Sequence, residues 1–276
     1  MKRSFFFILV VFFAMVANAQ YYYNDILATE QTNINYKQLR NNKIKKIKAV
    51  SKDANNELID GFFLLQELSN DGKKMQTTTA TSDGVNAELT SYYSNDRIVR
   101  TEGKSVNVNT IVDYVYDAAG KLQSITSTSS DTIINGYSTE AHIWQYNNKG
   151  LPEQMLKIKN GTDTTKIILL YDEKGNPGIE QWKKKNKSLE TYYYYFDAGK
   201  RVTDIVRYDE YRGKMLPDCL YEYDANGKII KMTQVRTGGR NYLVWKYTYN
   251  DKGLKLKEVC FDKTKHVLGF MEYSYN

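Results

Sequence analysis

The chain has few residues that could carry out catalysis or bind a metal. Its 276 residues include two histidines, His142 and His266, whereas a Ser–His–Asp triad or a multi-histidine metal site depends on this residue type. Both histidines stand within or at the start of expected strands, and we interpret them as ordinary strand residues. We therefore predict no catalytic residue, no metal ligand and no cofactor.

Two short motifs imitate ligand-binding loops without completing them. Gly103-Lys-Ser105 has the form of the end of a phosphate-binding loop, but Ile98 stands where that loop needs its first glycine. Asp224-Ala-Asn-Gly227 has the form of the start of a calcium loop, but Val235 stands where the closing glutamate belongs. Both segments are better interpreted as tight turns between strands.

Acidic side chains are plentiful, and a suitably spaced pair could hydrolyse a glycosidic bond. A β-sheet brings many acidic side chains to such separations, so no pair stands out among the 32 aspartates and glutamates. An enzyme that acts on envelope polysaccharide through carboxylates marked by no motif is the alternative to a non-enzymatic protein.

Aromatic side chains are the best candidates for a binding site, because flat rings offer apolar faces and tyrosine adds a hydrogen-bonding hydroxyl. Trp144 and Trp245 share a strand face with repeated tyrosines, so we expect them in the core. Trp182, Tyr193 and Tyr195 can lie on the opposite face. We predict that these three residues bind a ligand such as a glycan.

A turn motif recurs about every 26 residues and organises the chain. It consists of an aromatic residue, Asp or Asn, two further residues and Gly. Glycine permits the positive φ of a tight turn, and Asp or Asn can bond the turn backbone with its own side chain. A second set of turn residues alternates with the first, so each repeat holds two strands and two turns. The clear copies have their Asp or Asn at Asp117, Asn147, Asp172, Asp197, Asp224 and Asn250.

Between the turns, residues alternate with a period of two. Leu243, Trp245 and Tyr247 fall on one face of a strand, and Lys246 and Thr248 fall on the other. The pattern predicts an all-β fold: a long antiparallel meander of about sixteen strands in an extended, twisted or partly rolled single sheet. We expect residues 20–276 to form one domain, with clear repeats from about 60 to 276. Residues 43–48 suggest an early strand, and residues 21–42 are either a cap or a short helix.

The segments Tyr114-Val-Tyr-Asp-Ala-Ala-Gly-Lys-Leu122 and Tyr221 to Ile229 resemble the YD repeats of the RHS family. The likeness covers most of residues 60–276. Members of that family form long β-sheets that spiral into shells around toxins or into extracellular adhesion modules. The resemblance implies a β-repeat surface protein. Asn147 and Asn250 depart from the family pattern, which has Asp at these places, and the chain is much shorter than a toxin shell.

The N-terminus predicts export. Lys2 and Arg3 precede an unbroken apolar run from Phe5 to Val16, and Ala17-Asn-Ala19 fits a cleavage site, so residues 1–19 are expected to be a signal peptide. Gln20 rather than cysteine follows this site, so we do not expect a lipoprotein. No later apolar run is long enough to span a membrane. We expect a periplasmic or extracellular protein.

The charge balance is mildly basic. The formal net charge of +7 falls to about +5 without the signal peptide, which does not indicate nucleic-acid binding. The two cysteines, Cys219 and Cys260, would lie three strands apart, so a disulfide would require a strongly rolled sheet.

Two further segments suggest contacts with partners. The chain ends on a repeat strand, Met271 to Asn276, which could leave a bare sheet edge for self-association or a partner strand. The Ser/Thr-rich segment from Ser124 to Glu140 makes the repeat between Tyr116 and Tyr146 the longest and predicts either a protruding hairpin that contacts a partner or simply a longer hairpin. The leading hypothesis is an exported, non-enzymatic scaffold that binds a protein or glycan of the cell envelope through its sheet face. A companion or inhibitor of another exported protein is a further alternative.

Overall fold

The computed structural model describes residues 21–81, 84, 86–185, 187–209, 212–235 and 241–276. The predicted signal peptide lies outside these residues. They form one helix and eighteen strands. In chain order these are α1 (Asn24–Asn41), β1 (Lys46–Asp53), β2 (Phe63–Leu68), β3 (Lys74–Ala80), β4 (Asn86–Ser94), β5 (Arg97–Lys104), β6 (Val108–Tyr116), β7 (Leu122–Asp131), β8 (Gly136–Tyr146), β9 (Pro152–Lys159), β10 (Asp163–Tyr171), β11 (Pro177–Lys184), β12 (Lys187–Phe196), β13 (Val202–Asp209), β14 (Lys214–Tyr223), β15 (Ile229–Val235), β16 (Tyr242–Tyr249), β17 (Lys255–Phe261) and β18 (Val267–Tyr275).

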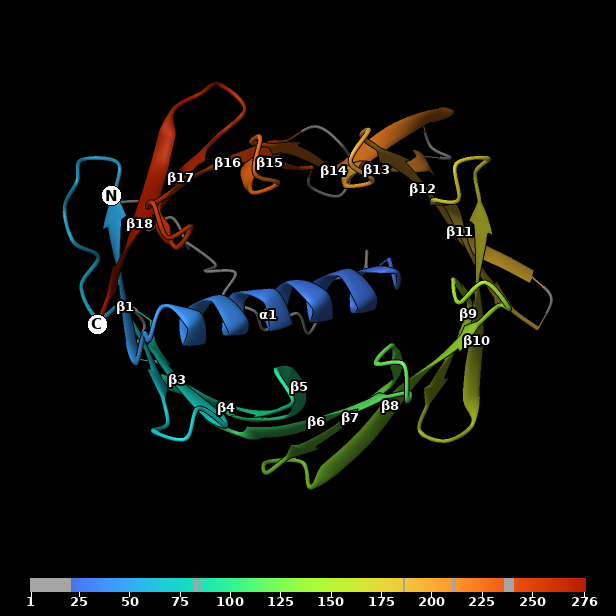
Figure 1. Cartoon of the computed structure of the whole chain (residues 1–276), viewed down its shortest axis with the longest axis horizontal. Helices are drawn as coiled ribbons and strands as arrows, with labels where there is room; N and C mark the ends of the chain where they lie inside the picture. The colour runs from blue at the N-terminus through green and yellow to red at the C-terminus, as the bar shows by residue number, and fades with distance from the viewer. Residues whose placement is uncertain (1–20, 82–83, 85, 186, 210–211, 236–240) are drawn as a thin grey trace.

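The strands close into a barrel around α1 (Figure 1). Each strand pairs antiparallel with its neighbours in sequence, and β1 completes the ring because it pairs with both β2 and β18. Ala49 of β1 lies opposite Leu64 on one side and Tyr273 on the other. The all-β antiparallel prediction is confirmed. The open or partly rolled sheet of about sixteen strands is wrong, because accumulated twist brings the two ends of the meander together.

Closure also corrects the prediction of a bare edge at the C-terminus. Strand β18 pairs with β1 from Ile47 opposite Tyr275 to Asp53 opposite Gly269. The carbonyl of Asn276 accepts hydrogen bonds from the N–H groups of Lys45 and Lys46. The backbone groups of this strand are therefore not available to a partner strand.

The repeated turns lie at one end of the barrel and have the predicted geometry. The N–H of Gly120 donates to the carbonyl of Asp117, and the N–H of Lys121 donates to the Asp117 carboxylate. Gly120 has a φ of +81°, and a Cβ there would stand 2.1 Å from the Arg97 guanidinium. Asn147 accepts the same bond from Leu151, which explains why Asn replaces Asp in some copies: the turn needs only an acceptor oxygen.

In six copies of the motif, the tyrosine directly before the Asp or Asn ties its strand to the preceding one. Its hydroxyl donates to a backbone carbonyl at the start of that strand, and we call this set of bonds the tyrosine ladder. The bonds, 2.5–2.8 Å long, run from Tyr116 to Ile98, Tyr146 to Leu122, Tyr171 to Pro152, Tyr223 to Val202, Tyr249 to Ile229 and Tyr275 to Lys255.

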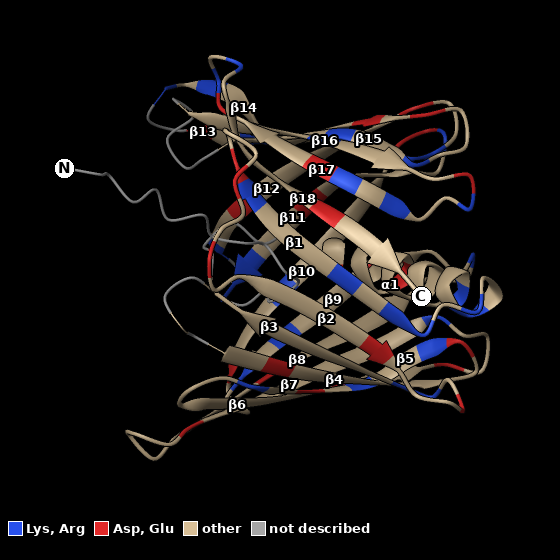
Figure 2. Ribbon diagram, turned by 90° about the vertical axis from the view of Figure 1, so that its left-hand side faces the viewer, with Lys and Arg blue, Asp and Glu red and all other residues tan. Residues whose placement is uncertain are grey.

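Helix α1 lies across the barrel interior, which we call the lumen (Figures 1 and 2), and it resolves the ambiguity over residues 21–42. The Tyr36 ring stacks on Tyr93 of β4 at 3.6 Å between centroids. Leu39 packs with Ile47 and Leu254 in one buried cluster. Aromatic and aliphatic side chains from the wall thus meet the helix to make the core.

The outer face of the wall carries charged side chains of both signs among uncharged ones (Figure 2). Arg100 contacts both Glu102 and Asp113 at 2.9 Å, and Glu272 contacts Lys52 and Lys257. Within the ranges that the structure describes, no helix is long and apolar enough to cross a membrane.

Candidate functional site

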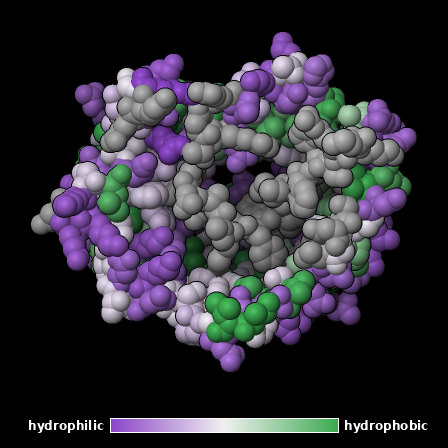
Figure 3. Space-filling model, turned by 180° about the vertical axis from the view of Figure 1, so that it is seen from behind, coloured by the Kyte–Doolittle hydropathy of each residue, from purple (hydrophilic) through white to green (hydrophobic). Residues whose placement is uncertain are grey.

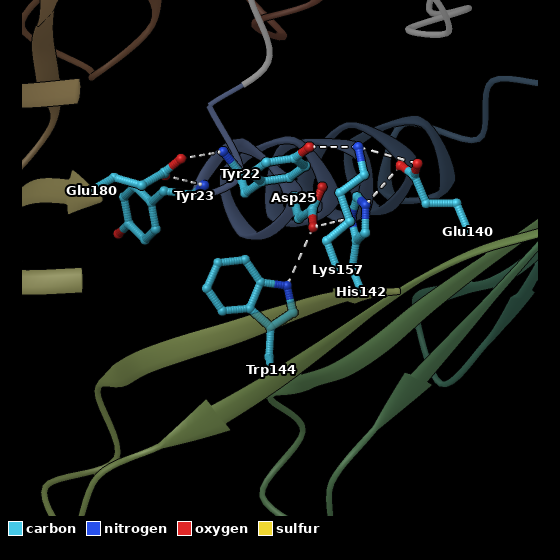
Figure 4. A network of polar contacts seen from close by, with 8 residues as sticks. All are labelled: Tyr22, Tyr23, Asp25, Glu140, His142, Trp144, Lys157 and Glu180. Carbon is cyan, nitrogen blue, oxygen red and sulfur yellow. Dashed lines mark hydrogen bonds and ion pairs between the residues drawn. The ribbon is translucent and has the colours of Figure 1, made fainter. Parts of the chain in front are cut away.

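A buried carboxylate holds the start of α1. Glu180 of β11 is fully buried and accepts hydrogen bonds from the backbone N–H groups of Tyr22 and Tyr23, both at 2.8 Å (Figure 4). Trp182 Nε1 and the Tyr194 hydroxyl donate to the same carboxylate at 2.5 and 2.7 Å. Burial raises the pKa of Glu180, and these donors pull it in the opposite direction. The carboxylate therefore supplies the helix cap from the barrel wall.

A second polar network fastens α1 to β8 and β9. The His142 ring lies between two carboxylates, with Nδ1 2.7 Å from Asp25 and Nε2 3.0 Å from Glu140 (Figure 4). Lys157 Nζ donates to the Tyr22 hydroxyl at 2.6 Å and lies 3.1 Å from Glu140. Trp144 Nε1 also donates to Asp25, at 3.3 Å.

The charges in this network are set by its burial and its geometry. Desolvation alone would lower the pKa of His142, but the hydrogen bonds that the ring donates to both carboxylates outweigh it and raise the pKa to about 9. The hydrogen bond from His142 is the main reason that the pKa of Glu140 falls to about 2. At neutral pH the network is thus an imidazolium between two carboxylates.

This arrangement is suited to fastening the helix rather than to acid–base catalysis. Both nitrogens of the His142 ring are engaged by side chains of the protein, so neither faces a substrate. Among the described residues, no group of three or more His, Cys, Asp or Glu side chains could hold a metal ion. The interpretation of His142 as an ordinary strand residue missed its role in anchoring α1. The sequence did contain one indication of this role: His142 lies on the same strand face as Trp144, which was expected in the core.

The three predicted ligand-binding residues lie on different sides of the wall. Trp182 points into the lumen, where its ring centroid is 4.7 Å from that of Tyr22 and 5.4 Å from that of Tyr192. It belongs to the core and is not part of a surface platform. The prediction that Trp182 lies on the same face as Tyr193 and Tyr195 was wrong, because alternation within one strand does not determine which face points into the barrel. Tyr193 and Tyr195 alternate with the buried Tyr192 and Tyr194 and therefore face outward.

An apolar row surrounds these two tyrosines on the outer wall. Leu170 of β10, Ile179 of β11, Tyr193 of β12, Val206 of β13 and Pro217 of β14 lie opposite one another in register across five strands. Successive cross-strand neighbours on one face lie close enough to contact. The row therefore forms a continuous apolar strip across five strands of the wall.

Two exposed tyrosines extend this strip in opposite directions along the strands. Tyr195 is 53% exposed and lies opposite Asp204, and Tyr208 is 51% exposed and lies two residues beyond Val206. Since residues two apart rise by about 7 Å, the three rings cover about 14 Å along the strands. We call Tyr193, Tyr195 and Tyr208 the outer tyrosine patch. Sequence analysis missed Tyr208, although it alternates with the residues that β13 turns inward.

Polar side chains border the patch. Gln181 of β11 lies opposite Thr191 of β12, and both face outward beside Tyr193. Asp204 stands opposite Tyr195. The patch thus combines flat apolar rings with an amide, a hydroxyl and a carboxylate.

The two cysteines do not form a disulfide. Cys219 lies half-buried on β14 and Cys260 is buried on β17, three strands away, as the repeat pattern predicts.

Comparisons with known proteins show similarity to solved structures only. No family model and no curated protein matches the chain, so the resemblance to YD repeats stays a prediction. A porin-like protein from Bacteroides uniformis is 12% identical with a TM-score of 0.34, over 84% of this chain and 96% of that one. A porin-like protein from Bacteroides vulgatus is 9% identical with a TM-score of 0.32, over 84% of this chain and 98% of that one. TcdB2-TccC3 without its hypervariable C-terminal region is 13% identical with a TM-score of 0.34, over 78% of this chain and 12% of that one.

Proposed function

We propose that this protein is an exported, non-enzymatic binding module that holds a glycan of the cell envelope against the outer tyrosine patch. The observation that carries the proposal is that Tyr193, Tyr195 and Tyr208 face outward from the neighbouring strands β12 and β13, beside the in-register apolar row. Exposed aromatic rings are the side chains best suited to stack on the apolar faces of sugars, and their hydroxyls can hydrogen-bond. Gln181, Thr191 and Asp204 offer further partners for sugar hydroxyls.

The charged outer wall supports a water-facing location for the patch. Ion pairs such as Arg100–Glu102 and Lys231–Glu222 lie along its strands. The signal peptide predicted at residues 1–19 supports a location in the envelope or outside the cell.

The lumen is less suited to a ligand at the site shown in Figure 4. Glu180, His142 and Lys157 already bond to α1 or to one another there. A ligand at this place would have to displace the helix from several charge-assisted hydrogen bonds, which are stronger than neutral ones. An open patch on the outer wall requires no such displacement.

Co-sedimentation with insoluble cell-wall and polysaccharide fractions tests the proposal. We expect the purified protein to be retained by at least one fraction and the Tyr193→Ala/Tyr195→Ala variant to lose roughly tenfold in affinity, because two stacking rings are removed. Tyr242→Ala is the matched control, since Tyr242 is an exposed tyrosine of β16 outside the patch. Equal retention of the patch variant, or no retention of the unmodified protein by any fraction, contradicts the proposal.

A further inference from the structure

The most exposed large hydrophobic side chains gather at one place. Among the described residues, the four with the greatest exposure are Val106 (71%), Ile133 (72%), Ile134 (74%) and Tyr137 (69%). Val106 lies in the β5–β6 loop, and the other three lie at the turn of the β7–β8 hairpin. We call these four residues the apolar tip. They lie at the end of the barrel opposite the repeated turns. Figure 3 shows hydrophobic side chains gathered along the lower edge of the molecule.

The two loops are tied to each other by hydrogen bonds. The backbone N–H and the hydroxyl of Thr132 both donate to the carbonyl of Asn107, at 2.9 and 3.2 Å. Within the hairpin, the Asp131 carboxylate accepts the N–H groups of Ile133 and Ile134 at 2.8 and 3.2 Å. The apolar side chains therefore stand on two loops whose N–H groups at Thr132, Ile133 and Ile134 are hydrogen-bonded within the protein.

The tip projects from the barrel. Strands β7 and β8 have 10 and 11 residues, and Figure 2 shows their hairpin extending beyond the rim at the lower left. The hairpin predicted from the Ser/Thr-rich segment 124–140 therefore protrudes. A convex tip cannot enclose a ligand, so its apolar side chains can be buried only by entering another phase or molecule.

We propose that the apolar tip inserts into the surface of a lipid bilayer with anionic headgroups. Entering an apolar layer is costly for unbonded backbone N–H groups, and those of Thr132, Ile133 and Ile134 are bonded. A fluid layer requires no shape complementarity from a small convex tip, whereas a protein pocket would. Tyrosine is enriched at the boundary between lipid and water, which suits Tyr137 beside the two isoleucines.

The charges near the tip favour anionic over neutral lipid. Between residues 104–109 and 131–137 the only acidic side chain is Asp131, whose carboxylate is occupied by the two N–H groups. Lys104 is exposed beside Val106. Farther around this end of the barrel, exposed lysines (Lys185, Lys187 and Lys214) alternate with exposed acids (Glu57, Asp60 and Asp163), so the free charge next to the tip itself is that of Lys104. Basic side chains near a membrane surface are attracted to anionic headgroups within a Debye length.

The inference is independent of the proposed function. The outer tyrosine patch is on β12 and β13, whereas the tip is carried by the loops between β5 and β6 and between β7 and β8. Insertion of the tip would orient the barrel on a membrane with its repeated turns facing away.

Vesicle sedimentation tests this inference. The purified protein is mixed with vesicles of phosphatidylethanolamine and phosphatidylglycerol, and with vesicles of phosphatidylcholine alone. We expect binding to the anionic vesicles that weakens with salt, and weaker binding to the neutral ones. The Ile133→Ser/Ile134→Ser variant should lose at least roughly tenfold in partitioning, because two aliphatic side chains no longer enter the lipid. Ile230→Ser/Leu256→Ser is the matched control, because both side chains are exposed at the opposite end of the barrel, next to the repeated turns.

A fluorescent label at Ile134→Cys, with Cys219 and Cys260 replaced by serine, gives a second readout. A blue shift on adding anionic vesicles supports insertion, whereas an unchanged spectrum overturns it. Equal partitioning of the serine and unmodified proteins, or no vesicle binding, also overturns the proposal. Cross-linking of the labelled position to one envelope protein in the absence of vesicle binding would assign the tip to a protein partner instead.

Discussion

At the residue scale, single carboxylates on the wall replace features that a helix normally carries itself. The residue before α1 is Tyr23, whose side chain makes no capping hydrogen bond. Glu180 caps the helix instead, although it is 157 residues away from Tyr23 in sequence. Its burial is tolerated because four donors surround it, whereas an unpaired buried carboxylate would be strongly destabilising.

The raised pKa of His142 predicts a pH dependence of stability. The unfolded value is close to 6.5 and the folded value is about 9, so the charged ring contributes fully below pH 6.5 and its contribution is lost as the pH rises through 9. We expect the unmodified protein to lose on the order of 3 kcal/mol of unfolding free energy between pH 6 and pH 9.5 through this group. Urea unfolding across this range measures the loss.

Two variants isolate the contribution of His142. His142→Gln should flatten the pH dependence over this range, whereas His266→Gln should leave it unchanged, because the His266 side chain is 82% exposed. A pH profile that is the same in His142→Gln and in the unmodified protein would refute the assignment.

At the element scale, the repeat motif joins neighbouring strands and neighbouring turns. Each ladder tyrosine donates to the preceding strand, and the cation of one turn covers the tyrosine ring of the next. Lys121 lies over Tyr146 at 5.3 Å and Arg201 over Tyr223 at 4.7 Å. The tyrosine hydroxyl thus bonds the preceding strand, and its ring face contacts the cation of the preceding turn. These two contacts account for the recurrence of Tyr and of Lys or Arg around the turns.

Removing one bond of the tyrosine ladder should cost a measurable amount of stability. Tyr223→Phe deletes the 2.7 Å bond to Val202 but keeps the ring under Arg201. We expect a loss of about 1 kcal/mol in unfolding free energy, measured by urea denaturation. Tyr195→Phe removes a hydroxyl from an exposed outer tyrosine and should change stability little. Equal effects of the two substitutions would argue against the ladder.

At the scale of the whole molecule, closure makes the first and last strands neighbours. The outward-facing Lys48 and Ser274 lie directly opposite each other in the β1–β18 pair. With both native cysteines replaced by serine, we expect Lys48→Cys/Ser274→Cys to form an intramolecular disulfide on oxidation. Lys48→Cys/Thr126→Cys is the control, since Thr126 lies on β7. Electrophoresis without reductant separates the outcomes: a dimer, or no cross-link, in the first variant would mean that the sheet is open.

Much of the local structure follows from sequence, and the reason is that its interactions are local. Asp117 with Gly120, and the alternation of Tyr192 to Tyr195, involve residues within one hairpin or strand. The outward orientation of Tyr193 and Tyr195 follows from that alternation once one face is known to be inside. The sheet edge predicted at Met271 to Asn276 was wrong because its partner, β1, lies more than two hundred residues earlier in the chain.

The sequence by itself determined the repeat, the turns, the antiparallel strands and the shared face of Tyr193 and Tyr195, because hydrogen bonding and side-chain alternation over a few residues specify them. Only the tertiary structure decided the closure of the barrel, the position of α1 in the lumen, the inward orientation of Trp182 and the union of two loops into the apolar tip. The physical reason is that each of these depends on groups far apart in the chain: β1 against β18, Glu180 against the start of α1, and Thr132 against Asn107. Their contacts exist only after accumulated twist has closed the sheet.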